Sequence, residues 1–133
     1  MKIVVDKVEC NPAHSISRQE VKAIFAGVPE EWKSGVERIR LANGSRRRLP
    51  VWLVGGEMTI LSRGLSKRFV VDEILIQLAK HALGLRRGLG QLTKADRIKL
   101  TAMVQPVLPG VWKQINDVAS VRKVIEYKLN GGE

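Results

Sequence analysis

The sequence predicts an α+β fold: a small sheet with a β-meander packed against a central buried helix, followed by a helical C-terminal third. Short segments in the first half alternate apolar with polar residues, as strands with one buried face do. Residues 70–83 instead place apolar side chains at helical spacing, and the segment beyond them carries helix-capping and helix-breaking residues. The chain of 133 residues has the size of one domain, so we assign residues 1–133 to a single core.

The N-terminal segment is expected to form a strand and then a helix. Residues 2–8 fit the strand, which ends near Asn11-Pro12. The helix is expected over residues 17–25. Ser15 or Ser17 can cap it, and Glu20 stands three residues after Ser17, as in a capping box.

The next three strands are expected at residues 36–42, 49–54 and 57–61. Asn43-Gly44 separates the first two and is a strong hairpin-turn signal, and Gly55-Gly56 separates the second pair. We therefore expect three strands that lie side by side in the order of the sequence, which is a β-meander.

The longest helical pattern lies in residues 70–83 and is expected to form the buried centre of the domain. Its apolar face consists of Val71, Ile74, Leu75, Leu78 and Ala82, and Ile76, Ala79 and Leu83 widen it. Gly84 is a suitable C-cap, although Leu85-Arg86-Arg87 could prolong the helix.

The last third is expected to contain two helices. Thr93 with Asp96 is typical of a capped helix start, and this helix runs to about Val104. Pro106 and Pro109 then interrupt the chain, and the last helix is expected over residues 118–129.

The charge of the chain favours polyanionic partners. Twenty-three Lys and Arg against thirteen Asp and Glu leave a net charge of +10 and a pI near 10.3. Nucleic acid is the first candidate and an anionic membrane surface the second, while the alternative is that the charge only aids solubility. We expect no membrane role, because the apolar helix faces are needed for the core. Without a signal-peptide pattern or a long apolar run, a cytoplasmic location is expected.

A resemblance to a known family rests on the stretch Leu75-Ile76-Gln77-Leu78-Ala79-Lys80-His81-Ala82-Leu83-Gly84. Together with residues 27–32 and 36–41, it resembles the minimal zincin-type metallopeptidase domain, whose active-site helix carries the HExxH motif. The similarity spans roughly residues 20–85. It implies a helix that packs across a small sheet.

This chain departs from the HExxH motif at two positions. The two histidines of the motif hold zinc, and its glutamate polarises the attacking water. Gln77 stands at the first histidine and Leu78 at the glutamate, so only His81 remains. The resemblance therefore implies a degenerate, non-catalytic member with no cofactor. A metal site built from Cys10, His14 and His81 stays open as an alternative, and so does a metal-dependent hydrolase.

Other catalytic patterns are missing from the sequence. It contains no G-x-S-x-G elbow and no phosphate-binding G-x-x-x-x-G-K-[ST] loop. The single cysteine, Cys10, excludes an internal disulfide and a zinc ribbon. The glycine-rich residues 84–90 follow a helix rather than a strand, so they do not predict a dinucleotide site. We therefore predict that the protein is not an enzyme.

The basic residues are concentrated in two groups. Arg46, Arg47 and Arg48 follow the Asn43-Gly44 turn, which predicts three guanidinium groups at a hairpin tip. Arg86 and Arg87 follow the central helix, and the two groups would form one phosphate-binding stripe if they share a face. The predicted nucleic-acid-binding residues are Arg46, Arg47, Arg48, Arg63, Lys67, Arg68, Arg86 and Arg87. The three tryptophans, Trp32, Trp52 and Trp112, are assigned to the core or an interface rather than to a stacking platform.

The sequence thus predicts a non-enzymatic domain that binds DNA or RNA through the arginine hairpin and the flanking basic residues. The alternative is a protein-interaction module, such as an adaptor or an antitoxin-like protein, whose acidic partner meets the same surface. Neither the preferred nucleic acid nor the oligomeric state follows from the sequence.

Overall fold

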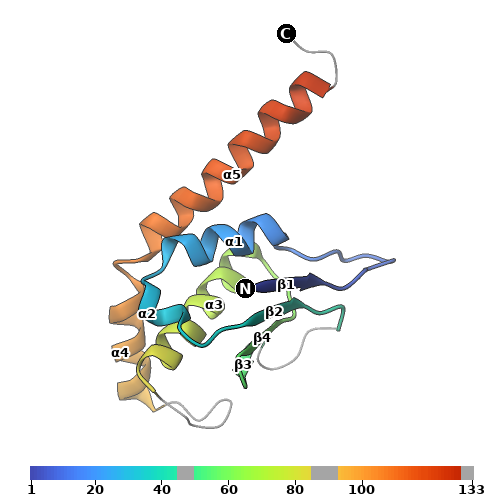
Figure 1. Cartoon of the computed structure of the whole chain (residues 1–133). Coiled ribbons are helices and arrows are strands. Elements are labelled where there is room, and N and C mark those ends of the chain that lie inside the picture. The colour runs from blue at the N-terminus through green and yellow to red at the C-terminus, as the bar shows by residue number, and fades with distance from the viewer. Residues whose placement is uncertain (45–49, 85–92, 130–133) are drawn as a thin grey trace.

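A computed structural model describes residues 1–44, 50–84 and 93–129 of the chain, with side chains up to residue 118. The α+β class is confirmed: a four-stranded sheet carries helices on one of its faces, and the C-terminal part is helical (Figure 1). No described helix combines the length and apolarity that crossing a bilayer requires.

The sheet has the strand order β1-β2-β4-β3. Its strands are β1 (Lys2–Val5), β2 (Arg38–Leu41), β3 (Val51–Val54) and β4 (Glu57–Ile60). β1 and β2 are parallel, β2 and β4 are parallel, and β3 runs antiparallel to β4 at the outer edge. Each strand is shorter than the stretch predicted for it.

The predicted β-meander is wrong in its strand order. The Gly55-Gly56 turn does join β3 to β4 as a hairpin, but β2 pairs with β4 rather than with β3. The Gly56 carbonyl accepts hydrogen bonds from the amides of Glu37 and Arg38, and Ala42 N donates to Ile60 O, so both ends of the β2–β4 pair are closed. The turn signal at Asn43-Gly44 therefore does not mark a hairpin.

Burial explains why β2 and β4 take the centre of the sheet. Ile39 and Leu41 on β2, and Met58 and Ile60 on β4, are fully buried, whereas on the same face of the edge strands Val5 of β1 is 36% exposed and Leu53 of β3 is only partly buried. A central strand has neighbours on both sides and buries more of its apolar face than an edge strand does. Turn propensity at Asn43 acts only locally and is overridden by this burial.

The connection from β1 to β2 contains two helices. α1 (Arg18–Gly27) begins at the predicted capping box, in which the Ser17 side chain accepts from Glu20 N and the Glu20 carboxylate accepts from Ser17 N. This reciprocal pair satisfies amides that have no partner inside the helix. The short α2 (Glu30–Lys33) was not predicted, and it buries Trp32 in the core.

The predicted central helix is α3 (Lys67–Ala82), which begins at Ser66 and ends before Gly84. Val71, Ile74, Leu75 and Leu78 have no exposed surface, as the helical spacing predicted. Gly84 adopts a φ of 66° and its amide donates to His81 O, so it terminates the helix in the conformation that glycine tolerates best.

The C-terminal part consists of α4 (Lys94–Val104) and α5 (Leu108–Leu129). The Thr93 and Asp96 side chains form the predicted capping box at α4. α5 begins at Leu108 rather than at residue 118, because Pro109 lies in the first turn, where its missing N–H has no intrahelical partner to lose. Val111 and Ile115 pack the start of α5 against α1, and Figure 1 shows the rest of the helix leading away from the body.

Candidate nucleic-acid interface

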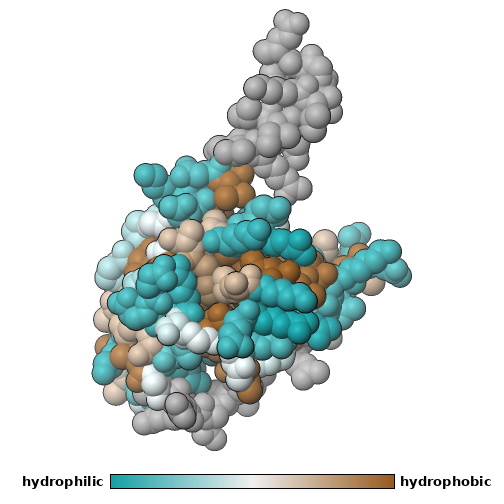
Figure 2. All heavy atoms as spheres, in the orientation of Figure 1, coloured by the Kyte–Doolittle hydropathy of each residue, from teal (hydrophilic) through white to brown (hydrophobic). Residues whose placement is uncertain are grey.

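The two faces of the sheet differ in charge and burial. The side chains of Ile39 and Leu41 point towards α1 and α3, whereas those of Arg38 and Arg40 alternate with them and are exposed on the other face. Figure 1 shows no helix on that other face, and Figure 2 shows hydrophilic side chains over much of the surface around β1 and β2. We call this uncovered side the open face.

The strand register defines two rows of side chains on the open face. One row crosses the sheet through Lys2, Arg38, Glu57 and Val54. The second row crosses it through Val4, Arg40, Thr59 and Trp52. The cations of both rows stand on β1 and β2, and one carboxylate, that of Glu57, stands between them and the edge strand β3.

Arg40 is held at the end of β2 by Asp6. Its Nε and Nη2 donate to the Asp6 carboxylate, with Nη2 to Oδ2 at 3.0 Å. The Arg40 hydrogen bond, helped by the Asn43 amide, lowers the pKa of Asp6 against the opposing effect of burial. The same hydrogen bond raises the pKa of Arg40. The guanidinium of Arg40 is therefore one half of an ion pair.

Lys2 and Arg38 have no carboxylate within ion-pair distance among the described residues. They are neighbours in the parallel register of β1 and β2, and both are exposed. The predicted set contained neither of them. Because they are 36 positions apart in the sequence, their pairing could not be predicted from it. Only the alternation along residues 36–42 could have placed Arg38 on the face of the strand that points away from the core.

Of the predicted binding residues, Arg63 has its guanidinium occupied by the protein itself. Nε donates to Pro12 O at 2.8 Å, Nη1 donates to Asn43 O at 2.6 Å, and Nη2 lies 3.4 Å from Cys10 O. These bonds join the β1–α1 loop and the end of β2 to the loop before α3. The arrangement indicates a structural role for this side chain.

Lys67 and Arg68 lie at the start of α3 and are both exposed. Lys67 forms an ion pair with Glu20 of the α1 capping box. Burial raises the pKa of Asp72, and the charge of the nearby Arg68 partly opposes that shift. Both cations thus face the helix layer and not the open face.

The other predicted residues, Arg46 to Arg48 and Arg86 to Arg87, lie outside the described residues. Their described neighbours stand at opposite ends of the sheet. Pro50, which follows the first group, accepts a hydrogen bond from Leu61 beyond the end of β4. Gly84, which precedes the second group, bonds to His81, and His81 Nε2 donates to Ser34 O before the start of β2. The described residues that border the two segments therefore lie at opposite ends of the parallel strands.

The three side chains considered as metal ligands are also separated in the fold. His14 Nε2 donates to Asp6 O after the end of β1, whereas His81 is bonded beside the start of β2. Cys10 is exposed and lies beside Arg63. Within the part of the chain that the structure describes, no group of three His, Cys, Asp or Glu side chains lies close enough together to hold a metal ion.

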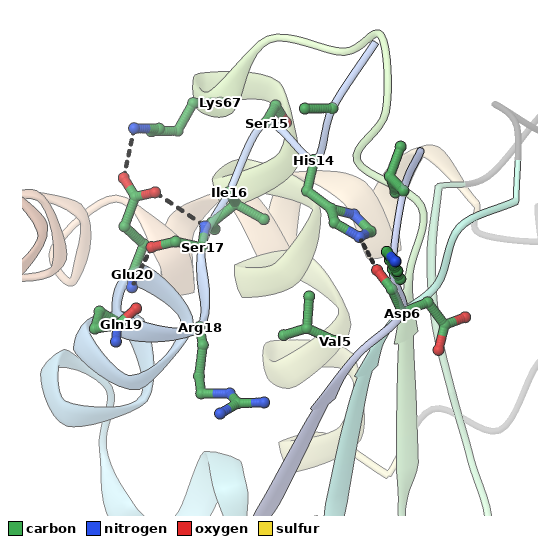
Figure 3. A pocket seen from close by; sticks show the side chains of 13 residues that line it. Val5, Asp6, His14, Ser15, Ile16, Ser17, Arg18, Gln19, Glu20 and Lys67 are labelled. Atoms are coloured by element: carbon green, nitrogen blue, oxygen red, sulfur yellow. Dashed lines mark hydrogen bonds and ion pairs between the residues drawn. The ribbon is translucent and has the colours of Figure 1, made fainter. Parts of the chain in front are cut away.

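A cavity of about 680 Å³ opens between the end of β1 and the start of α1 (Figure 3). Asp6, Glu20, Arg18 and Lys67 line it, so its wall contains both signs of charge. Two wall atoms, His14 Nδ1 and Ser15 Oγ, are buried and find no hydrogen-bond partner among the described residues. A helix N-terminus attracts anions, but here the Glu20 carboxylate already takes that place and pairs with Lys67. The cavity is therefore poorly suited to a phosphate group.

Comparison of the chain with protein-family models, curated proteins and solved structures gives no match.

Proposed function

We propose that the protein is a non-enzymatic nucleic-acid-binding domain whose contact surface is the open face of the sheet. One observation carries this proposal: among the described residues, the face of the sheet without a helix layer presents Lys2 and Arg38, neither of which lies within ion-pair distance of a described carboxylate. Arg40, which is paired with Asp6, and the carboxylate of Glu57 complete this face. Phosphate contacts from Lys and Arg supply most of the sequence-independent affinity for nucleic acid.

The sequence adds to this surface at one end. Arg46 to Arg48 follow β2, whose last residues carry Arg40, and the flanking Pro50 is bonded next to β4. These arginines are proposed to extend the contact beyond the end of the strands. Arg63 is left out of the contact, because its donors already serve backbone carbonyls.

The test is a fluorescence-anisotropy titration of nuclease-treated protein with labelled single-stranded and duplex DNA over a salt series. The Lys2→Gln/Arg38→Gln variant is expected to bind more weakly and to reduce the salt slope by about 2, since each lost phosphate contact removes about 1. The matched control is Lys22→Gln/Lys113→Gln, which removes the same charge from exposed positions on α1 and α5. Equal binding by the two double variants would rule out the open face as the contact surface.

A protein partner is the second candidate, and the edge strand β3 favours it. Val54 at its end is 68% exposed, and an edge strand offers unpaired backbone groups to an incoming strand. An acidic partner would meet the same cations. Retention of a protein partner after nuclease treatment, with loss of that partner in Lys2→Gln/Arg38→Gln, would favour this function over nucleic-acid binding.

A further inference from the structure

We infer that the nucleic acid recognised by the open face is single-stranded, with its phosphates over β1 and β2 and an unpaired base stacked on Trp52. This inference rests on the proposed function and specifies the ligand of that same surface. It assigns to Trp52 a role that is different from that of Trp32, which is buried in the core.

The cations form one side of the surface. Lys2 and Arg38 stand on adjacent strands, about 4.8 Å apart across the sheet, and Arg38 and Arg40 stand two residues apart along β2, about 7 Å. Lys2 and Arg38 therefore stand side by side at one level of the sheet, and Arg40 follows along β2. A phosphodiester chain that runs along β1 and β2 meets Lys2 and Arg38 together and then Arg40.

Trp52 forms the other side of the surface. It stands in the same row as Arg40, two strand spacings away, which is about 10 Å. Its neighbours along β3, Val51 and Leu53, point to the core face, so the half-buried Trp52 side chain belongs to the open face. Between Arg40 and Trp52 stands only the short side chain of Thr59. The Arg40 guanidinium is bonded to Asp6 on the β1 side of β2, so the row offers a low position over Thr59 beside the indole.

This arrangement discriminates between single strands and duplexes. In a duplex each base is covered above and below by its neighbours, and only its edges are accessible in the grooves. An unpaired base has a free ring face, and stacking on an aromatic side chain then adds affinity whatever the base is. The cations contact both kinds of ligand through phosphate, so the indole alone makes the difference.

The experiment compares Trp52→Ala with Val54→Ala, which removes apolar area from the same face of the same strand without removing a ring. The probes are a labelled oligothymidylate and a duplex of the same length. Trp52→Ala is expected to weaken oligothymidylate binding by about 5- to 150-fold, the range that one base–aromatic stack contributes. Duplex affinity, the salt slope and the affinities of Val54→Ala are expected to stay unchanged.

A second measurement covers the case in which Trp52→Ala loses its fold. Trp52→Phe keeps an aromatic ring and is expected to bind oligothymidylate nearly as well as the parent chain. Binding is expected to quench tryptophan emission in the parent and in Val54→Ala, and not in Trp52→Phe. Quenching that persists in Trp52→Phe would overturn the stacking role.

The failures of the two proposals are distinguishable. If the parent chain binds neither probe, nucleic-acid binding itself is wrong. If it binds both probes and folded Trp52→Ala loses affinity for neither, or for both equally, the open face binds nucleic acid without stacking, and the single-strand inference alone is overturned.

Discussion

The two faces of the sheet are built by the same four strands, yet they carry different side chains. On the covered face Ile39, Leu41, Met58 and Ile60 have no exposed surface. On the open face the intervening residues include Lys2, Arg38, Arg40 and Trp52. Because neighbouring residues of a strand point to opposite faces, a substitution can change one face and leave the other intact. Folding stability and binding should therefore be separable residue by residue.

The largest effect is expected on the covered face. Ile39→Ala should lower the free energy of unfolding by about 2–5 kcal/mol, because it leaves a cavity in the centre of the sheet. Urea denaturation measures this change. Its neighbour Arg38→Ala should change stability by no more than about 0.5 kcal/mol, as exposed substitutions do. Similar losses in the two variants would remove the distinction between the faces.

A loss of intermediate size is expected at Arg63, which the sequence placed among the binding residues. Arg63→Ala removes the donors to Pro12 O and Asn43 O and should cost about 1–3 kcal/mol of stability. The control is Arg68→Ala, at an exposed position in the first turn of α3, and this substitution should be nearly neutral. Below the melting temperature Arg63→Ala should keep its affinity for nucleic acid, and a selective loss of affinity in the folded variant would return Arg63 to the binding surface.

A smaller effect, and one that depends on pH, is expected for Asp6. Arg40 holds the pKa of Asp6 in the folded state below the ordinary value of 3.8, so the ion pair stabilises the fold above that value. This contribution is lost as the pH falls through the lowered pKa. Asp6→Asn should therefore be slightly less stable than the parent at pH 7 and equal to it in strong acid. Thermal unfolding at the two pH values tests this.

The same substitution should also increase the affinity for nucleic acid. Asp6→Asn releases the guanidinium of Arg40 from its carboxylate, so nucleic acid should bind more tightly and with a steeper salt slope. Asp117→Asn removes an equal charge from an exposed position on α5 and serves as the control. Equal gains in both variants would mean that only net charge matters, and not the position of Arg40.

The smallest effect is expected in the helix layer, at Glu73. Burial raises the pKa of Glu73 above the ordinary 4.5, while Arg97 partly opposes that shift. The folded state then holds the proton more tightly than the unfolded state does, so stability falls as the pH rises through the raised pKa. Glu73→Gln should be slightly more stable than the parent at pH 7 and should have no advantage below pH 4. The exposed Glu31→Gln should show no such pH dependence.

Local elements were predicted well because their signals lie within a few residues of each other. Ser17 with Glu20 and Thr93 with Asp96 form the expected capping boxes, and the apolar spacing of residues 70–83 marks the buried helix α3. The Gly55-Gly56 hairpin follows for the same reason. In contrast, the predicted start of α5 was wrong. Proline breaks a helix from an interior position but is tolerated in the first turn, and Pro109 lies in the first turn.

The candidate site was only partly accessible from the sequence. The charge of the chain indicated a polyanionic ligand, but Lys2 and Arg38 become neighbours only through parallel pairing of β1 with β2. Arg63 carries the same charge as Arg38, and only its three carbonyl contacts distinguish a structural arginine from an exposed one.

The sequence by itself thus determined the net charge, the helix caps and the alternation that divides each strand into two faces, since these depend on composition and on short-range geometry. The tertiary structure decided the strand order, the side of the sheet that the helices cover and the cations that remain exposed. The physical reason is that burial is shared among segments far apart in the chain: β2 and β4 pair because together they bury Ile39, Leu41, Met58 and Ile60 under the helices, and Lys2, Arg38, Arg40 and Trp52 are left on the other face as a consequence.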